Sequence, residues 1–197
     1  MPTDFELLAA WRAGDIEAGN TLVRRHFLGL YAFVRAKVPE AADDLIQKIW
    51  EGCVQARDRI DERASFKAYL FGIARRQLVY FFREARRDRD HLDTMVESIA
   101  QLSGSPSRHV ALREEQHAML TALNGLPLDL QIALELYYWE ELSVADVAAV
   151  LDVPEGTVKS RLHRARQLLR EQLDQAEVGE DAELETLKRL RGALVAK

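Results

Sequence analysis

The stretch LSVADVAAVLDVPEGTVKSRLHRARQLLRE, residues 142–171, has the proportions of a helix-turn-helix. Ser143 can cap the first helix, because its hydroxyl accepts a hydrogen bond from a backbone N–H that has no partner within the helix. The turn falls at Asp152 and Val153, and Pro154 has the φ angle that the start of the next helix requires. Three small residues of the first helix are expected to let the second approach closely: Ala145, Ala148 and Ala149.

The second helix of this pair has two different faces when its residues are placed at intervals of about 100°. Four apolar residues fall together and are expected to be buried: Val158, Leu162, Ala165 and Leu169. The other faces carry side chains that can bind base edges or phosphates in a major groove. Seven of them are candidate DNA contacts: Lys159, Ser160, Arg161, His163, Arg164, Arg166 and Gln167. A surface helix of an ordinary bundle is the alternative.

Positive charge is concentrated in two stretches of a chain whose net charge is -5. Residues 156–170 carry five bases and no acid, and residues 67–89 carry seven bases against two acids. Two compact basic patches on an acidic body are typical of a protein that binds a polyanion locally and repels it elsewhere. For either patch alone, a solvated arginine-rich helix face is the alternative.

We expect an all-α chain with two small helical domains joined by a flexible linker, because no stretch shows the polar–apolar alternation of a strand. Residues 88–107 are polar and close in SGSPS, which marks a domain boundary. The chain is therefore divided into domains at 1–88 and 108–173, a linker at 89–107 and a C-terminal extension at 174–197. Helices are predicted over residues 4–13, 16–38, 42–57, 66–87, 108–123, 128–139, 144–151 and 154–173. An amphipathic helix is predicted in the extension, with Leu184, Leu187, Leu190 and Leu194 on its apolar side.

Composition argues against several classes of protein. Cys53 is the single cysteine and the five histidines are scattered, so neither a disulfide framework nor a metal cluster is expected. No glycine-rich phosphate loop is present, and we expect no catalytic residues and no cofactor. No apolar run approaches the length of a membrane span, and the first residues lack the basic start of a signal peptide. We expect a cytoplasmic protein without membrane insertion that is not an enzyme.

Residues 126–171, LPLDLQIALELYYWEELSVADVAAVLDVPEGTVKSRLHRARQLLRE, resemble the C-terminal promoter-binding domain of extracytoplasmic-function (ECF) sigma factors. These are the short, two-domain branch of the sigma-70-type factors, which direct bacterial RNA polymerase to promoters. PEGTVKSRLHRAR is close to a signature of that family, whereas a LuxR-like regulator carries a TVK helix but does not continue SRLHRAR. The resemblance implies that the second helix reads the minus-35 element of a promoter.

The N-terminal half resembles the same family. AADDLIQKIWEGCVQA, residues 41–56, is similar to the helix that docks on the clamp helices of the polymerase β′ subunit, which implies polymerase contacts by Asp44, Gln47 and Lys48. SFKAYLFGIARRQLVYFFREARR, residues 65–87, is similar to the helix that engages the minus-10 element. Its bases can hold phosphates and its exposed rings can stack on unpaired bases. The candidate minus-10 contacts are Arg75, Arg76, Tyr80, Arg83, Arg86 and Arg87. In this family the preceding loop, residues 58–65, captures a flipped base.

The sequence departs from the family pattern in both halves. Lys48 stands where an acid is common, which reverses the charge of the docking strip formed by Asp44, Gln47 and Lys48. Arg76 and Tyr80 replace the usual asparagine and aspartate. Basic residues that often follow LP are replaced by Asp129, Leu130 and Gln131. The grip on the minus-35 backbone should therefore depend more on the recognition helix.

Together these features predict a sigma factor that binds promoter DNA and core RNA polymerase, through the β′ clamp helices and the β flap. An anti-sigma factor or another regulator is a candidate partner. The alternative is a conventional helix-turn-helix regulator that uses only the C-terminal domain. For the extension, residues 174–197, three roles stay open: competing with DNA for the recognition helix, recruiting a regulator, or forming a loosely packed solubilising segment.

Overall fold

The structure is a computed structural model that describes residues 1–60, 65–85, 93–95, 97–103, 113–174 and 183–195. Within these ranges the chain is helical and forms no strand, and Ser98 and Pro127 make an isolated bridge. The predicted all-α class, with two small helical domains, is confirmed. None of the described helices is long and apolar enough to cross a membrane.

Four helices form the N-terminal half. A reciprocal capping box starts the first one, since the Thr3 hydroxyl accepts from the Glu6 N–H while the Thr3 N–H donates to the Glu6 carboxylate at 2.7 Å. Asp15 caps the second helix by accepting from the Ala18 N–H at 3.1 Å. The helices are α1 (Asp4–Arg12), α2 (Ile16–Arg35), α3 (Ala42–Ala56) and α4 (Phe66–Ala85), with 3₁₀ turns η1 (Pro39–Ala41) and η2 (Arg57–Arg59).

The end of α2 lies three residues before the predicted end at Val38. Proline disfavours the helical conformation of the residue before it, and Val38 has φ -142° and ψ 66°. The helix therefore unwinds ahead of Pro39, which begins η1. Below this bend, Phe33 of α2 meets Phe71 of α4 edge to face at 5.1 Å, and both rings are fully buried.

The C-terminal half is arranged around α7, of which nine consecutive residues, Leu128 to Leu136, are buried. Helix α5 was not predicted; it lies within residues 89–107 and buries Ile99 and Leu102. The helices of this half are α5 (Ile99–Ser103), α6 (Glu114–Gly125), α7 (Leu128–Tyr138), α8 (Val144–Leu151) and α9 (Glu155–Asp174).

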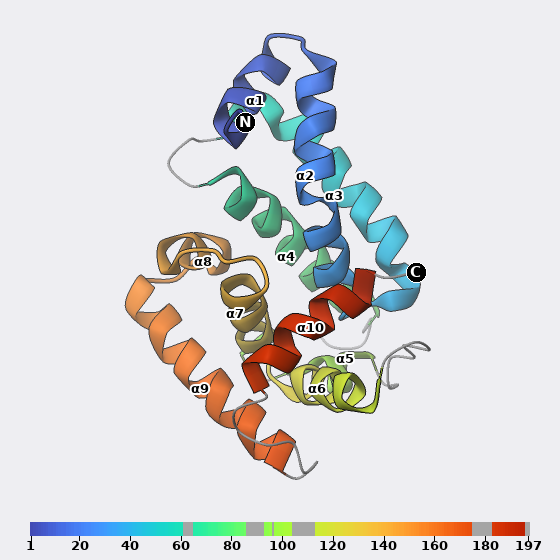
Figure 1. Ribbon diagram of the computed structural model, residues 1–197, viewed down its shortest axis with the longest axis vertical. Helices are drawn as coiled ribbons and strands as arrows, with labels where there is room; N and C mark the ends of the chain where they lie inside the picture. Colours follow the sequence, from blue (N-terminus) through green and yellow to red (C-terminus); the bar gives the residue numbers. More distant parts are fainter. Residues whose placement is uncertain (61–64, 86–92, 96, 104–112, 175–182, 196–197) are drawn as a thin grey trace.

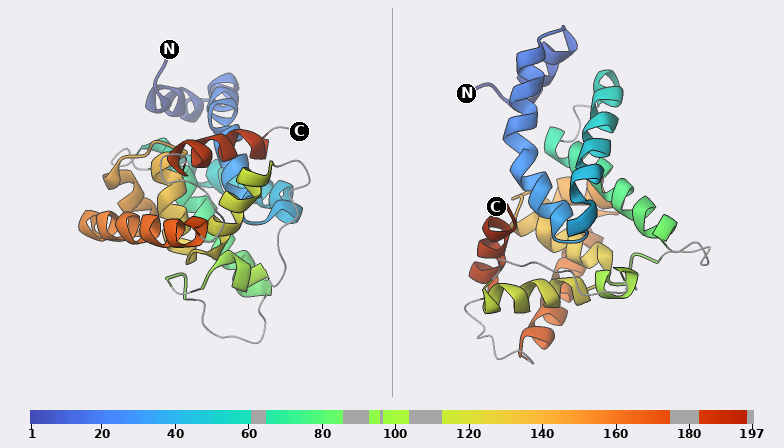
Figure 2. Two further views of the ribbon diagram at one scale, coloured as in Figure 1. Left: turned by 60° about the horizontal axis from the view of Figure 1, so that its bottom comes forward. Right: turned by 90° about the vertical axis from the view of Figure 1, so that its right-hand side faces the viewer.

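The two halves pack against each other, which the sequence did not predict. Helix α4 lies beside α8, and the last helix, α10 (Glu183–Val195), crosses from α6 and α7 to α2 (Figures 1 and 2). The predicted apolar side of α10 is buried at Leu187, Leu190 and Leu194, with at most 1% of each residue exposed. A loosely packed extension is therefore wrong for residues 183–195.

Candidate nucleic-acid interface

Helices α8 and α9 form the predicted helix-turn-helix. The Ser143 hydroxyl accepts from the Asp146 N–H at 3.0 Å and so caps α8. Asp152 ends α8 in the left-handed conformation, with φ 55°, which aspartate adopts more readily than bulkier residues. The Pro154 carbonyl then accepts from the N–H groups of Thr157 and Val158, which starts α9.

The packing of α8 on its neighbours differs from the prediction at two alanines. Ala148 is buried, but Ala145 and Ala149 are exposed. The buried side of α8 consists instead of Val147, Val150 and Leu151 together with Ala148. Close approach of the two helices therefore rests on one small residue rather than three.

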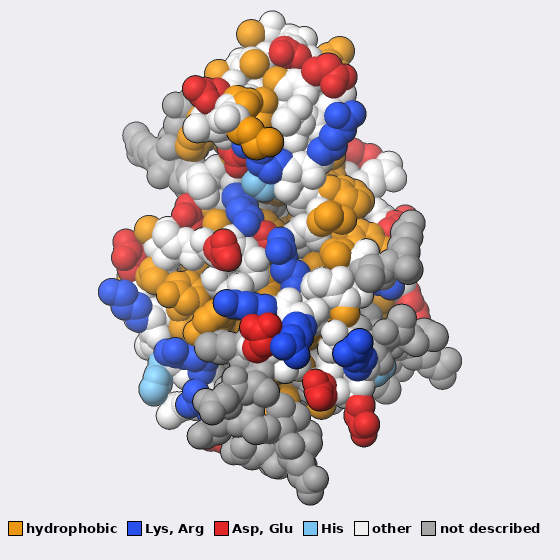
Figure 3. Space-filling model, viewed as in Figure 1, with side chains coloured by type: hydrophobic (Ala, Val, Ile, Leu, Met, Phe, Trp, Pro, Cys, Tyr) orange, Lys and Arg blue, Asp and Glu red, His pale blue; other side chains and the backbone are white. Residues whose placement is uncertain are grey.

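The predicted buried face of α9 is confirmed. Val158 and Ala165 are fully buried, and Leu162 and Leu169 are at most 6% exposed. This stripe orients the opposite face outward, and the residues exposed there are Lys159, Ser160, His163, Arg164, Arg166 and Gln167. Figure 3 shows basic side chains and a histidine along the lower-left edge of the molecule, over α9. We call this exposed set the α9 polar face.

Three candidate DNA contacts of α9 already have partners within the protein. The Ser160 hydroxyl donates to the Thr157 carbonyl at 2.9 Å, and Arg166 donates to the Leu162 carbonyl at 3.3 Å. Arg161 turns inward, since its side chain is only 12% exposed and one guanidinium nitrogen lies 3.3 Å from the Asp129 carboxylate. Arg161 is thus not on the exposed face of α9 in this structure.

Helix α4 carries a second basic surface. Arg76, Tyr80 and Arg83 are exposed, and together with Arg75 and Thr94 they border a hollow of about 620 Å³. The Tyr80 ring is available for stacking because the residue is 56% exposed, and its hydroxyl donates to Glu84 at 2.7 Å. We call Arg76, Tyr80 and Arg83 the α4 basic face. The candidates Arg86 and Arg87, and residues 61–64 of the loop at residues 58–65, lie outside the described residues.

The docking strip on α3 is exposed at all three of its residues: Asp44, Gln47 and Lys48. Next to it, Gln47, Trp50 and Val54 contribute to a hollow of about 340 Å³. Val54 is 53% exposed although its side chain is apolar. The reason is helical geometry: nine residues at about 100° each put Val54 on the side of the helix opposite Leu45.

A single carboxylate joins the two candidate DNA-binding helices. Asp129, at the start of α7, accepts from Arg75 of α4 at 3.0 Å and from Arg161 of α9 at 3.3 Å. The Thr94 hydroxyl donates to the same carboxylate at 3.0 Å. Asp129 is 3% exposed, so in this arrangement the two arginines neutralise a buried charge. The departure from the family pattern at this position was a signal for Asp129, but its partners come from tertiary structure.

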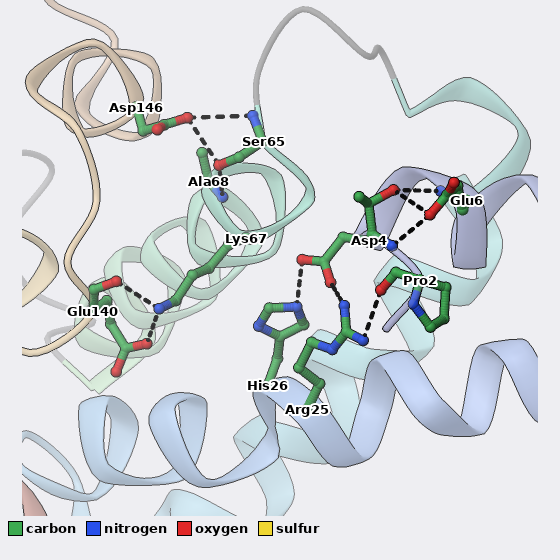
Figure 4. A network of polar contacts seen from close by, with 11 residues as sticks. Pro2, Asp4, Glu6, Arg25, His26, Ser65, Lys67, Ala68, Glu140 and Asp146 are labelled. Atoms are coloured by element: carbon green, nitrogen blue, oxygen red, sulfur yellow. Dashed lines mark hydrogen bonds and ion pairs between the residues drawn. The ribbon is translucent and has the colours of Figure 1, made fainter.

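Two more acidic residues tie the C-terminal half to α4 (Figure 4). Asp146 of α8 accepts from the Ser65 hydroxyl at 2.8 Å and from the Ser65 N–H at 3.2 Å. Partial burial works against its charge, but the hydrogen bonds from Ser143 and Ser65 outweigh burial and lower the pKa of Asp146. Glu140 accepts from Lys67 at 2.8 Å and is 3% exposed. Both contacts therefore join the start of α4 to an acidic side chain of residues 140–146.

A fully buried ion pair lies between α2 and α7. Lys37 donates to the Glu135 carboxylate and also to the Phe33 carbonyl at 2.9 Å. Its ammonium lies 3.7 Å from the centre of the Phe33 ring. Burial lowers the pKa of Lys37 and raises that of Glu135, because each charge has lost its water, and the partner's charge opposes both shifts. Removing either side chain would therefore leave the other charge buried without its partner.

Two observations concern the reactive side chains of the described residues. Among the described residues, no group of His, Cys, Asp and Glu side chains could hold a metal ion. Burial raises the pKa of the Cys53 thiol to about 12, so this residue is a poor nucleophile. The described residues expose the α9 polar face, the α4 basic face and the docking strip.

Two family models match this chain, one in its N-terminal half and one in its C-terminal half. Residues 22–88 match the model of sigma-70 region 2, and residues 116–169 match the model of sigma-70 region 4. The first range includes α3 and α4, and the second includes α7, α8 and most of α9.

Two ECF sigma factors are similar to this chain along most of their length. The ECF RNA polymerase sigma factor SigM of Mycobacterium tuberculosis is 31% identical over 166 residues, which is 83% of this chain and 81% of that protein. The ECF RNA polymerase sigma-E factor of Escherichia coli is 28% identical over 176 residues, 85% of this chain and 92% of that protein.

Two solved structures are similar in fold. The structure of CnrH in complex with the cytosolic domain of CnrY has a TM-score of 0.64 and 26% identity, covering 87% of this chain and 97% of that one. The sigma factor RpoE in complex with the anti-sigma factor NepR, from Bartonella quintana, has a TM-score of 0.60 and 27% identity, covering 81% and 97%.

Proposed function

Because this chain belongs to the ECF family of RNA polymerase sigma factors, it directs promoter-specific transcription initiation, and we propose how its surfaces divide that task. The α9 polar face reads the minus-35 element, the α4 basic face holds the minus-10 element, and α3 docks on the polymerase. In this assignment residues 1–88 bind polymerase and the minus-10 element, residues 108–173 bind the minus-35 element, and residues 89–107 connect them.

One observation carries the proposal: a single chain has two exposed basic helix faces, each backed by its own buried stripe. A conventional regulator needs one such face to bind its operator. A factor that recognises two separated promoter elements needs two. The docking strip on α3 is a third surface, which a regulator acting through its helix-turn-helix alone does not require.

On α9, the proposed contacts differ in chemistry. Arg164 and Lys159 can donate to the acceptors of guanine in the major groove, and Gln167 can pair with adenine. His163 adds a donor or acceptor beside them. Arg166 folds back along the helix, so we assign it to phosphates rather than to base edges.

On α4, the proposed task is to hold a melted strand. Arg76 and Arg83 would neutralise phosphates, and the exposed Tyr80 ring would stack on an unpaired base. Phe82 does not share this role because it is 1% exposed and packs in the core. The aromatic contribution therefore falls mainly on Tyr80.

On α3, the proposed polymerase contact combines charge with apolar area. Asp44 and Lys48 give the strip both signs of charge, and the exposed Val54 lies beside the partly buried Trp50. The Trp50 Nε1 is buried and has no hydrogen-bond partner. An apolar centre with a charged rim suits a helix-on-helix interface.

The chain's own part in transcription is binding, and the polymerase carries out the chemistry. We therefore propose that this protein is not an enzyme, needs no cofactor and acts in the cytoplasm, where the polymerase and promoter DNA are found. The complexes of CnrH with CnrY and of RpoE with NepR support an anti-sigma factor as a further partner.

Promoter binding with and without core polymerase tests this function. We expect a labelled fragment carrying a target promoter to be retained and opened only when core polymerase and this protein are both present. A control variant with Lys48, Asp44 and Gln47 changed to alanine should lose the core-dependent complex. Sequence-specific binding by the protein alone, unaffected by core polymerase, would support a conventional regulator instead.

A further inference from the structure

Helix α10 is bonded to both halves of the protein. At one end, the indole N–H of Trp139, just after α7, donates to the Leu187 carbonyl at 2.7 Å. At the other end, Arg35 of α2 donates to the Leu194 carbonyl at 2.7 Å. Between these two bonds Leu190 is fully buried. The helix thus spans the boundary between the halves rather than extending either one (Figure 1).

An ionic contact strengthens this bridge. Arg191 of α10 lies 3.0 Å from the Glu140 carboxylate, which also binds Lys67 of α4 at 2.8 Å. Gly29 of α2 completes the arrangement, because a Cβ there would lie 2.6 Å from a Glu140 carboxylate oxygen. The Glu140 carboxylate is therefore in close contact with α2, α4 and α10 at once.

The arrangement that α10 spans is incompatible with reading a whole promoter. Arg75 of the minus-10 region and Arg161 of the minus-35 helix bind the same Asp129 carboxylate, within 3.3 Å. The two elements are named for positions about 25 base pairs apart, which is about 85 Å along B-form DNA. Helices α4 and α9 must move apart before both can reach one promoter.

We propose that α10 is a built-in clasp that holds the free protein in a closed, weakly DNA-binding form. The inference rests on the proposed function, since it needs α4 and α9 to face DNA. Three features of the closed form act together: α10 spans the two halves, Glu140 joins α4 to α10, and Asp129 occupies Arg75 and Arg161. Promoter engagement requires release of α10 from its contact surface on α2, α6 and α7.

The distance between the halves provides a direct test in the full-length protein. Cysteines replace the exposed Glu17 on α2 and Glu171 on α9 and carry a fluorescent donor and acceptor. Cys53 is fully buried and its raised pKa of about 12 keeps it unreactive toward the dyes. Energy transfer and binding to a random-sequence 40-base-pair duplex are then measured in the same samples.

Leu190→Asp is the opening variant, and Gly192→Asp is its matched control, since it adds the same single negative charge on the exposed side of α10. We expect Leu190→Asp to lower energy transfer and to tighten duplex binding about tenfold, as when one molecule in ten is open before the change. The control should leave both unchanged. Gly29→Ala opens the clasp from α2 and covers the case in which Leu190→Asp does not fold. The clasp would be overturned if Leu190→Asp and Gly29→Ala fold, keep the wild-type energy transfer and bind the duplex with unaltered affinity.

Run-off transcription with core polymerase separates this inference from the function itself. A wild-type transcript together with no difference between Leu190→Asp and Gly192→Asp, in distance or in duplex binding, retains the sigma function and rejects the clasp. An opened variant that binds the duplex more tightly but yields no promoter-specific transcript retains the clasp and rejects the proposed division of surfaces.

Discussion

Replacing Lys37 by methionine should strongly destabilise the closed protein. Both Lys37 and Glu135 are fully buried, and Glu135 keeps only the hydrogen bond from Gln131, at 2.8 Å, once the ammonium is gone. Removing one member of a buried ion pair costs about 3–5 kcal/mol, because the other charge is left without water or a partner. Part of that cost can be avoided if the halves separate and Glu135 regains water.

Urea unfolding followed by circular dichroism measures the loss. At a slope of about 2–3 kcal/mol per molar urea, a loss of about 3–5 kcal/mol lowers the midpoint by about 1–2.5 M. Lys188→Met, on the exposed side of α10, is the control and should leave the midpoint unchanged. The double variant Lys37→Met with Glu135→Leu removes both charges. Its free energy of unfolding should lie between the wild-type value and a value about 4 kcal/mol higher.

A Lys37→Met protein that unfolds at the wild-type urea concentration and keeps the wild-type distance between the halves would contradict this prediction. Such a result would mean that water reaches Glu135 in the closed form. A double variant as unstable as the single one would show that the site needs the ion pair for packing rather than for charge balance.

Three further predictions concern other surfaces. Arg164→Ala should weaken minus-35 binding by about 1–3 kcal/mol if the side chain reads a base, and an equal loss on every sequence in a competition assay would make it a phosphate contact. Lys48→Glu should leave binding to the β′ clamp helices unchanged or tighter in a pull-down, and a severe loss would show that Lys48 has an acidic partner of its own. Asp4 is partly buried, which works against its charge, but His26 and Arg25, at 2.7 Å and 2.6 Å, outweigh burial and lower its pKa from 3.8. Its contribution to stability is therefore present above pH 3.8 and is lost as the pH falls through the lower pKa of the folded state. Asp4→Asn should flatten the acid limb of a plot of unfolding free energy against pH, and an unchanged limb would contradict this.

Helical periodicity accounts for what the sequence predicted well. The buried stripe of α9 follows directly from residues at 100° intervals, and the bounds of α8 agree with the prediction because Ser143 caps its start. Pro39 predicted the region in which α2 ends but not its last residue. The proline restricts the backbone of Val38, so the helix ends before the predicted position.

Contacts between the halves could not be predicted from local patterns. Asp129 was identified as a departure from the family pattern, yet a sequence does not say that Arg75 and Arg161 converge on it from 54 and 32 residues away. Likewise, the leucines of α10 predicted an apolar side without indicating which surface covers it. Pairings of this kind depend on how whole helices pack.

Mapping transcript 5′ ends tests whether this protein selects promoters for RNA polymerase. Core polymerase is incubated with genomic DNA, with and without the protein, and the 5′ ends are sequenced. We expect new starts only in its presence, preceded by one shared pair of elements near positions -35 and -10. Identical 5′ ends with and without the protein would contradict the account.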